Sequence, residues 1–88
     1  MPGDPSTVYR DRFRRLFADC CISIGKSGNI ILVKTLSGAA SAVGEAVDGL
    51  NLDGILGTVA GDDALLVVVA EEENPEDVLE TLRKIAGL

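Results

Sequence analysis

The stretch that most constrains how this chain folds is residues 57–64, which read GTVAGDDA. A short apolar segment, residues 56–60, runs into Gly61, two aspartates follow, and a longer apolar run covers residues 64–70. Gly tolerates a positive φ and Asp hydrogen-bonds its own backbone, so residues 61–63 favour a tight turn. The pattern predicts a β-hairpin with two buried strands and with Asp62 and Asp63 at its tip.

Two adjacent carboxylates at a turn need an explanation, because like charges close together disfavour the ionisation of both groups. A Gly-Asn or Asp-Gly pair turns the chain without that cost. The cost is small where the tip is fully solvated, and the pair is useful where a cation binds. Both interpretations of Asp62 and Asp63 are open at this point.

Positive charge is concentrated at the start of the chain. Six of the eight Lys and Arg residues lie in residues 1–34, and residues 35–82 contain none. A buried charge needs a partner, so any carboxylate of that span that becomes buried must find its cation near the chain ends, in another subunit or in a ligand. The carboxylates of the span are Glu45, Asp48, Asp53, Asp62, Asp63, Glu71, Glu72, Glu73, Glu76, Asp77 and Glu80.

Hydrophobic periodicity predicts four strands and two helices. The first helix is expected to begin at Ser37, a good N-cap, and to end at Gly49 and Asn51. The second helix is expected to run from its cap Asn74 to Gly87. The order β-β-α-β-β-α indicates a two-layer α+β fold, a four-stranded and mostly antiparallel sheet with two helices on one face. The strands are expected at residues 17–24, 29–34, 56–60 and 64–70.

The first of these helices is expected to have an apolar face and a polar one. The polar face is either solvated or, because it contains small residues, approached closely by another backbone. The apolar stripe is Ala39, Val43, Ala46, Val47 and Leu50, and the opposite face carries Ser41, Gly44, Glu45 and Asp48.

The start of the chain is expected to lie outside the folded domain. Residues 1–15 are predicted to be a linker or a remnant of a removed N-terminal domain, and residues 16–88 the folded domain. The basic stretch 9–15 is either a nucleic-acid arm or a solvated connector, which we favour because the patch is small. The chain begins without a charged-then-apolar signal pattern and has no apolar run of about 18 residues, so a cytoplasmic location without a membrane span is expected.

Two of the predicted strands, residues 29–34 and 64–70, are apolar on both faces. A two-layer domain needs apolar residues on only one face of its sheet. An apolar face left exposed marks an interaction surface, and the simplest partner is a second copy of the chain. The sequence therefore predicts an obligate homo-oligomer.

Several kinds of site are disfavoured by the composition. The chain has no His and its two cysteines, Cys20 and Cys21, are adjacent, so neither a zinc site nor a disulfide framework is expected. The Gly-Lys-Ser triplet at residues 25–27 lacks the earlier Gly and the following helix that a phosphate loop requires. An enzyme built on the aspartates would lack an activated nucleophile and a His, so no catalytic residue, metal or cofactor is expected.

Three segments resemble the C-terminal domain of the bacterial arginine repressor. They are residues 34–40 (KTLSGAA), 48–50 (DGL) and 54–63 (GILGTVAGDD). The resemblance extends over residues 16–88, and the segment GTVAGDD is its most specific part. Ala64 departs from the family, which usually has Thr there, and Ser41 stands where some members have Gln.

The resemblance implies an effector domain that forms trimers, which pair into a hexamer with L-arginine, the corepressor, bound at the trimer–trimer interface. It also implies that the winged helix-turn-helix domain that holds operator DNA in the family is absent from this chain. Carried over residue by residue, the ligand-binding positions are Asp62, Asp63, Ala60, Thr58, Asp48 and Ser41.

The chemistry of the residues agrees with that implication. A guanidinium is planar, always charged and directs two N–H groups at a carboxylate, so arginine would supply the positive charge that residues 35–82 lack. A ligand that joins two trimers stabilises the hexamer by mass action. Two hypotheses stand beside each other: an arginine-gated oligomerisation module of a transcriptional repressor of arginine metabolism, and an amino-acid-sensing domain that is not tied to DNA.

Overall fold

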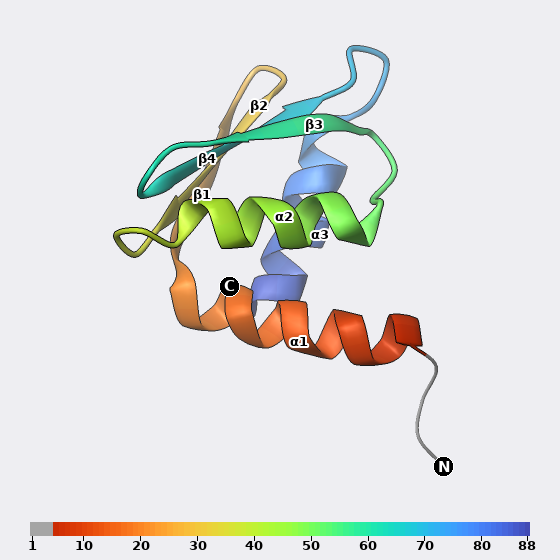
Figure 1. Ribbon diagram of the computed structural model, residues 1–88. Coiled ribbons are helices and arrows are strands. Elements are labelled where there is room, and N and C mark those ends of the chain that lie inside the picture. The colour runs from red at the N-terminus through yellow and green to blue at the C-terminus, as the bar shows by residue number, and fades with distance from the viewer. Residues whose placement is uncertain (1–4) are drawn as a thin grey trace.

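The computed structural model describes residues 5–88, with side chains for residues 11–88. From residue 21 onward it has the predicted order β-β-α-β-β-α, so the α+β prediction is confirmed, and a further helix precedes it (Figure 1). The elements are α1 (Pro5–Cys20), β1 (Cys21–Ser27), β2 (Ile30–Thr35), α2 (Ala40–Leu50), β3 (Ile55–Ala60), β4 (Ala64–Val69) and α3 (Pro75–Ala86).

The four strands form one sheet in the order β1-β2-β4-β3, and every neighbouring pair is antiparallel. Figure 1 shows α2 and α3 against one face of the sheet and α1 below these two helices, on the side away from the strands. None of the helices in residues 5–88 combines the length and the apolar character needed to cross a lipid bilayer.

The core lies between the sheet and the helices and is almost entirely aliphatic. Alternate residues of β2 and β4 point into it, as the period of two requires, and the apolar stripes of α2 and α3 cover them. Its fully or nearly fully buried members include Ile31, Val33, Val43, Val47, Leu65, Val67, Val69, Leu79 and Leu82.

The start of the domain differs from the prediction. Residues 17–20, expected as the beginning of a strand, form the last turn of α1, and β1 begins at Cys21. Phe13 and Phe17 are one helical turn apart, both are buried, and their rings meet edge to face with centroids 5.1 Å apart. This aromatic pair packs α1 against the core, so the part of the expected linker that the structure describes, residues 5–15, is helical. Residues 1–4 lie outside the described residues.

The two helices that follow differ in how they begin. Asn74 caps α3 as predicted, because its side chain accepts a hydrogen bond of 3.0 Å from the backbone N–H of Glu76. The prediction that Ser37 caps α2 was wrong, because α2 begins at Ala40 and has no side-chain cap. Gly38, between Ser37 and the start of α2, adopts φ +80°, a conformation that favours Gly. The chain turns there, and the Ser37 side chain reaches Asp62 in the β3–β4 hairpin.

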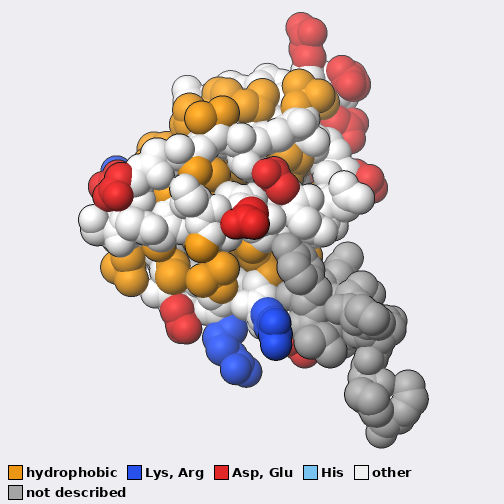
Figure 2. Space-filling view, viewed as in Figure 1, with side chains coloured by type: hydrophobic (Ala, Val, Ile, Leu, Met, Phe, Trp, Pro, Cys, Tyr) orange, Lys and Arg blue, Asp and Glu red, His pale blue; other side chains and the backbone are white. Residues whose placement is uncertain are grey.

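No helix of the described residues covers the outer face of the sheet. Leu32, Leu66 and Val59 are cross-strand neighbours in β2, β4 and β3, and 39%, 40% and 63% of their surfaces are exposed. Figure 2 shows hydrophobic side chains gathered over the strands. The two-faced apolar pattern of the sequence is therefore a real surface feature of the single chain.

We expect Phe13→Ala to lower the free energy of unfolding by about 3–5 kcal/mol, since it leaves a cavity between α1 and the core. Urea denaturation at one fixed protein concentration measures this change. Arg14→Ala, at an exposed position of the same helix, is the control and should change it by less than about 0.5 kcal/mol. A loss for Phe13→Ala as small as that of the control would mean that α1 is not part of the domain in solution.

Candidate functional site

The candidate site is centred on the tip of the hairpin between β3 and β4. Asp62 and Asp63 occupy this tip and are both exposed. The backbone N–H of Gly61 donates to the carbonyl of Ala64 at 2.8 Å and closes the turn, and the carbonyl of Asp63 accepts from the N–H of Thr35 at 2.8 Å. The turn that was predicted from Gly and Asp is present, and the end of β2 holds it in place.

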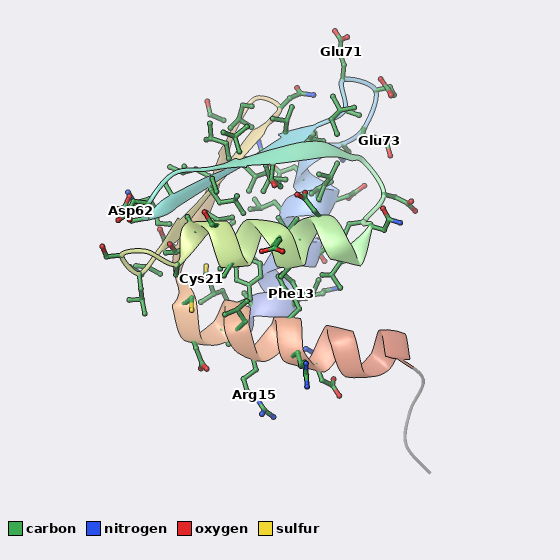
Figure 3. The ribbon with its side chains drawn as sticks, in the orientation of Figure 1. Phe13, Arg15, Cys21, Asp62, Glu71 and Glu73 are labelled. Carbon is green, nitrogen blue, oxygen red and sulfur yellow. The ribbon has the colours of Figure 1, made fainter. Side chains whose placement is uncertain are left out.

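Asp62 is attached to the segment that leads into α2. Its carbonyl accepts hydrogen bonds from the N–H groups of Gly38 and Ala40, at 3.1 and 3.3 Å, and its carboxylate Oδ2 accepts one from the Ser37 hydroxyl at 3.0 Å. The first N–H groups of a helix have no partner within the helix, so the tip provides one for the start of α2. Figure 3 shows Asp62 at the end of the hairpin, beyond the first turn of α2.

Asp63 has a different partner. Its Oδ2 lies 3.9 Å from the ammonium of Lys34 in β2, and both side chains are about half exposed. An exposed ion pair at this distance contributes little to stability, on the order of 0–1 kcal/mol. The two adjacent acids are therefore not equivalent: Asp63 lies near a cation of its own chain, whereas Asp62 is bonded to a hydroxyl.

A second carboxylate–hydroxyl pair lies between α2 and β3. The hydroxyl of Thr58 donates to Oδ1 of Asp48 at 3.1 Å. Gly44 is buried here, as the second of the two interpretations of its helix face required: a Cβ at this position would lie 2.9 Å from Leu65 Cδ1 and 3.5 Å from Thr58 Oγ1. The absence of a side chain allows α2 to approach β3 closely enough for the Asp48–Thr58 bond to form.

The remaining predicted site residues lie between these two pairs. Ser41 is exposed on α2 and follows Ala40, whose N–H donates to the carbonyl of Asp62. Ala60 is the last residue of β3 and faces Gly44. Asp48 is eight residues beyond Ala40, or about 12 Å along α2 at 1.5 Å per residue. The six predicted residues thus line one elongated surface, with a carboxylate toward each end, rather than converging on one point.

This surface does not enclose a ligand within one chain. The hollow beside Asp48 measures about 120 Å³ and is lined in part by Val47, Leu52 and Leu56, whereas small-molecule sites usually measure about 300–1,000 Å³. A ligand bound along this face would need further contacts from outside the chain.

Charge is unevenly distributed around the surface. Figure 2 shows carboxylates at the hairpin tip and over α2, while Lys and Arg side chains gather below them, over α1. Glu71 and Glu73 are exposed on the turn after β4, and Glu71 points away from the body of the molecule (Figure 3). The candidate surface therefore carries carboxylates toward both ends, and Lys34, beside Asp63, is the cation that the described contacts place there.

Metal binding finds no support among residues 11–88, where no group of three or more His, Cys, Asp and Glu side chains could hold an ion. Partial burial raises the pKa of the Cys21 thiol, and the neighbouring Cys20 raises it further. The thiolate is the metal-binding and nucleophilic form, so the raised pKa makes Cys21 a weaker nucleophile and metal ligand than a free cysteine.

These features define a class of protein: a small α+β domain with an uncovered apolar sheet face and an acidic hairpin tip bonded to the start of a helix. The family model described as "Arginine repressor, C-terminal domain" matches residues 17–84. The chain belongs to this family, which confirms the resemblance noted from the sequence. Members of the family are transcription regulators, and the domain is not an enzyme.

Similar proteins named arginine repressor include those of Alkaliphilus metalliredigens, which is 44% identical over 78 residues, and Moorella thermoacetica, which is 45% identical over 84 residues. The first alignment covers 89% of this chain and 52% of the relative, and the second covers 96% and 56%. The chain therefore spans about half the length of the curated relatives that it matches.

Two residues of the site were not identified from the sequence. Ser37 was interpreted as a helix cap, and Lys34 was not connected with Asp63. Both contacts depend on the distance between segments far apart in sequence, which no local pattern contains. For Gly44 the signal was present, because the small residues of its helix face allowed another backbone to approach closely.

Proposed function

We propose that this domain is the arginine sensor of a transcriptional repressor of arginine metabolism. L-arginine binds along the acidic surface and connects two copies of the chain. The ligand-binding residues are Asp62, Asp63, Ala60, Thr58, Asp48 and Ser41, and L-arginine is an effector rather than a cofactor.

The observation that carries this proposal is the position of Asp62. Its carboxylate is exposed at a rigid turn, is bonded to a neutral hydroxyl, and belongs to a span of the chain without Lys or Arg. A guanidinium matches such a carboxylate with two parallel N–H groups and carries its charge at every physiological pH. Asp48 and Thr58, at the other end of the surface, offer a second carboxylate for the α-ammonium of the same or a neighbouring arginine.

The apolar outer face of the sheet supports an assembly that does not need ligand. Leu32, Leu66 and Val59 form a continuous apolar row, and covering such a row with another copy removes it from water. We assign this face to the trimer and the acidic surface to the contact between two trimers. Arginine then stabilises the hexamer because it binds the paired state better than the separate trimers.

The DNA-binding part of the proposal concerns the whole repressor. The chain spans about half of its relatives, and we assign operator binding to a winged helix-turn-helix domain joined to the N-terminal side of this one. A hexamer holds several such domains together and raises operator affinity through multivalency. The regulator works in the cytoplasm, where it meets DNA and free arginine.

We expect Asp62→Asn to weaken L-arginine binding by about 1.5–3 kcal/mol, the usual contribution of a hydrogen bond to a charged group. Isothermal titration calorimetry measures the loss, and citrulline, which is uncharged at the same end, should bind the unmutated chain poorly. Asp53→Asn, an exposed acid outside the site, is the matched control and should bind like the unmutated chain. Unchanged affinity in Asp62→Asn would exclude this carboxylate as the guanidinium anchor.

We expect the chain to be oligomeric at micromolar concentration even without ligand, and its mass to increase when L-arginine is added. Light scattering coupled to size-exclusion chromatography measures both states. Leu66→Asp places a charge in the apolar row and should produce monomers. A monomeric unmutated chain, or a mass that does not respond to arginine, would contradict the proposed assembly.

A further inference from the structure

Among the residues that the structure describes, the Ser37 side chain is the one that forms a hydrogen bond with the Asp62 carboxylate. The two backbone bonds from Gly38 and Ala40 go to the carbonyl of Asp62 and fix the turn, but they leave the side chain free to rotate. The bond from Ser37 Oγ to Oδ2, 3.0 Å long, joins residues 25 positions apart in sequence. It selects the direction in which the carboxylate points.

The energetics of this bond favour such a role. A hydrogen bond to an ionised carboxylate is stronger than one between neutral groups, and a side chain that is already oriented loses less entropy when it binds a ligand. A carboxylate has about four acceptor positions, and Ser37 occupies one of them. Oδ1 and the remaining position on Oδ2 stay available for a ligand.

We propose that Ser37 is a positioning residue, which orients the Asp62 carboxylate to receive the two parallel N–H groups of a guanidinium. This inference rests on the proposed arginine-binding function and adds a determinant of specificity to it. A fixed carboxylate plane matters for a planar two-pronged donor and much less for the single, freely rotating ammonium of lysine. Ser37 therefore contributes to the preference for arginine over lysine.

The neighbouring acid provides an internal comparison. Asp63 lies 3.9 Å from Lys34 and has no hydroxyl partner among the described residues. A long contact with a flexible ammonium orients a carboxylate weakly. Ser37 should therefore act through Asp62 and not through Asp63, although the two aspartates are adjacent.

The first test is calorimetry on Ser37→Ala. We expect arginine affinity to fall by about three- to tenfold, the equivalent of one modest hydrogen bond, and lysine affinity to change by less than about twofold. Ser37→Thr, which keeps the hydroxyl, should restore the arginine affinity. Thr81→Ala is the matched control, because it removes a hydroxyl bond of the same length, 3.0 Å, from an exposed position of α3. Equal losses for arginine and lysine would overturn the proposal.

A double-mutant cycle separates positioning from a general structural effect. If Ser37 acts through Asp62, Ser37→Ala should cause no further loss of arginine affinity in an Asp62→Ala background. The same change should cause its full loss in an Asp63→Ala background. Full additivity with Asp62→Ala would show that Ser37 acts in another way.

A measurement without ligand keeps this inference separate from the proposed function. Three-bond NMR couplings about χ1 of Asp62 should report one rotamer in the unmutated chain and rotamer averaging in Ser37→Ala. Averaging in both would overturn the positioning role even if arginine binds. A single rotamer lost in Ser37→Ala would support that role even if the unmutated chain failed to bind arginine, a failure that would count against the proposed function alone.

Discussion

The hydrogen bonds between the hairpin tip and the start of α2 are the constraint on which the site depends. The carbonyl of Asp62 accepts two N–H groups there, and the carbonyl of Asp63 accepts one from the end of β2. The bond from Ala40 gives the first N–H group of α2 a partner, and the three bonds together hold two carboxylates at a defined place on a packed scaffold. An acidic loop without them would present the same charges with no fixed geometry.

The distribution of charge connects this geometry to assembly. In the single chain the carboxylates of the candidate surface are exposed, and solvation stabilises them at little cost. A second copy placed over the surface would remove that solvation, and residues 35–82 contain no Lys or Arg to replace it. Lys34 lies near Asp63, but Asp62 and Asp48 have only hydroxyl partners among the described residues. Since a buried unpaired charge is strongly unfavourable, a contact that buries these two carboxylates needs a cation from outside. In the proposed function, a free amino acid with a guanidinium supplies this cation and makes assembly depend on its concentration.

Much of this could be predicted from the sequence where the signal is local. The glycine and aspartates of the hairpin turn, the Asn74 cap of α3 and the alternating strands each act on their immediate neighbours. The end of α1 was missed because Phe17 and the cysteines after it fit a period of two as well as a helix, and only packing against the core decides between them. The role of Ser37 was missed because its partner is distant in sequence and close only in the fold.

The most direct test of the account is a crystal structure of the chain grown with saturating L-arginine. The account predicts a guanidinium within hydrogen-bond distance of the Asp62 carboxylate, at a contact between two copies of the chain. Both aspartates surrounded by water and remote from every neighbouring copy, at full arginine saturation, would contradict it.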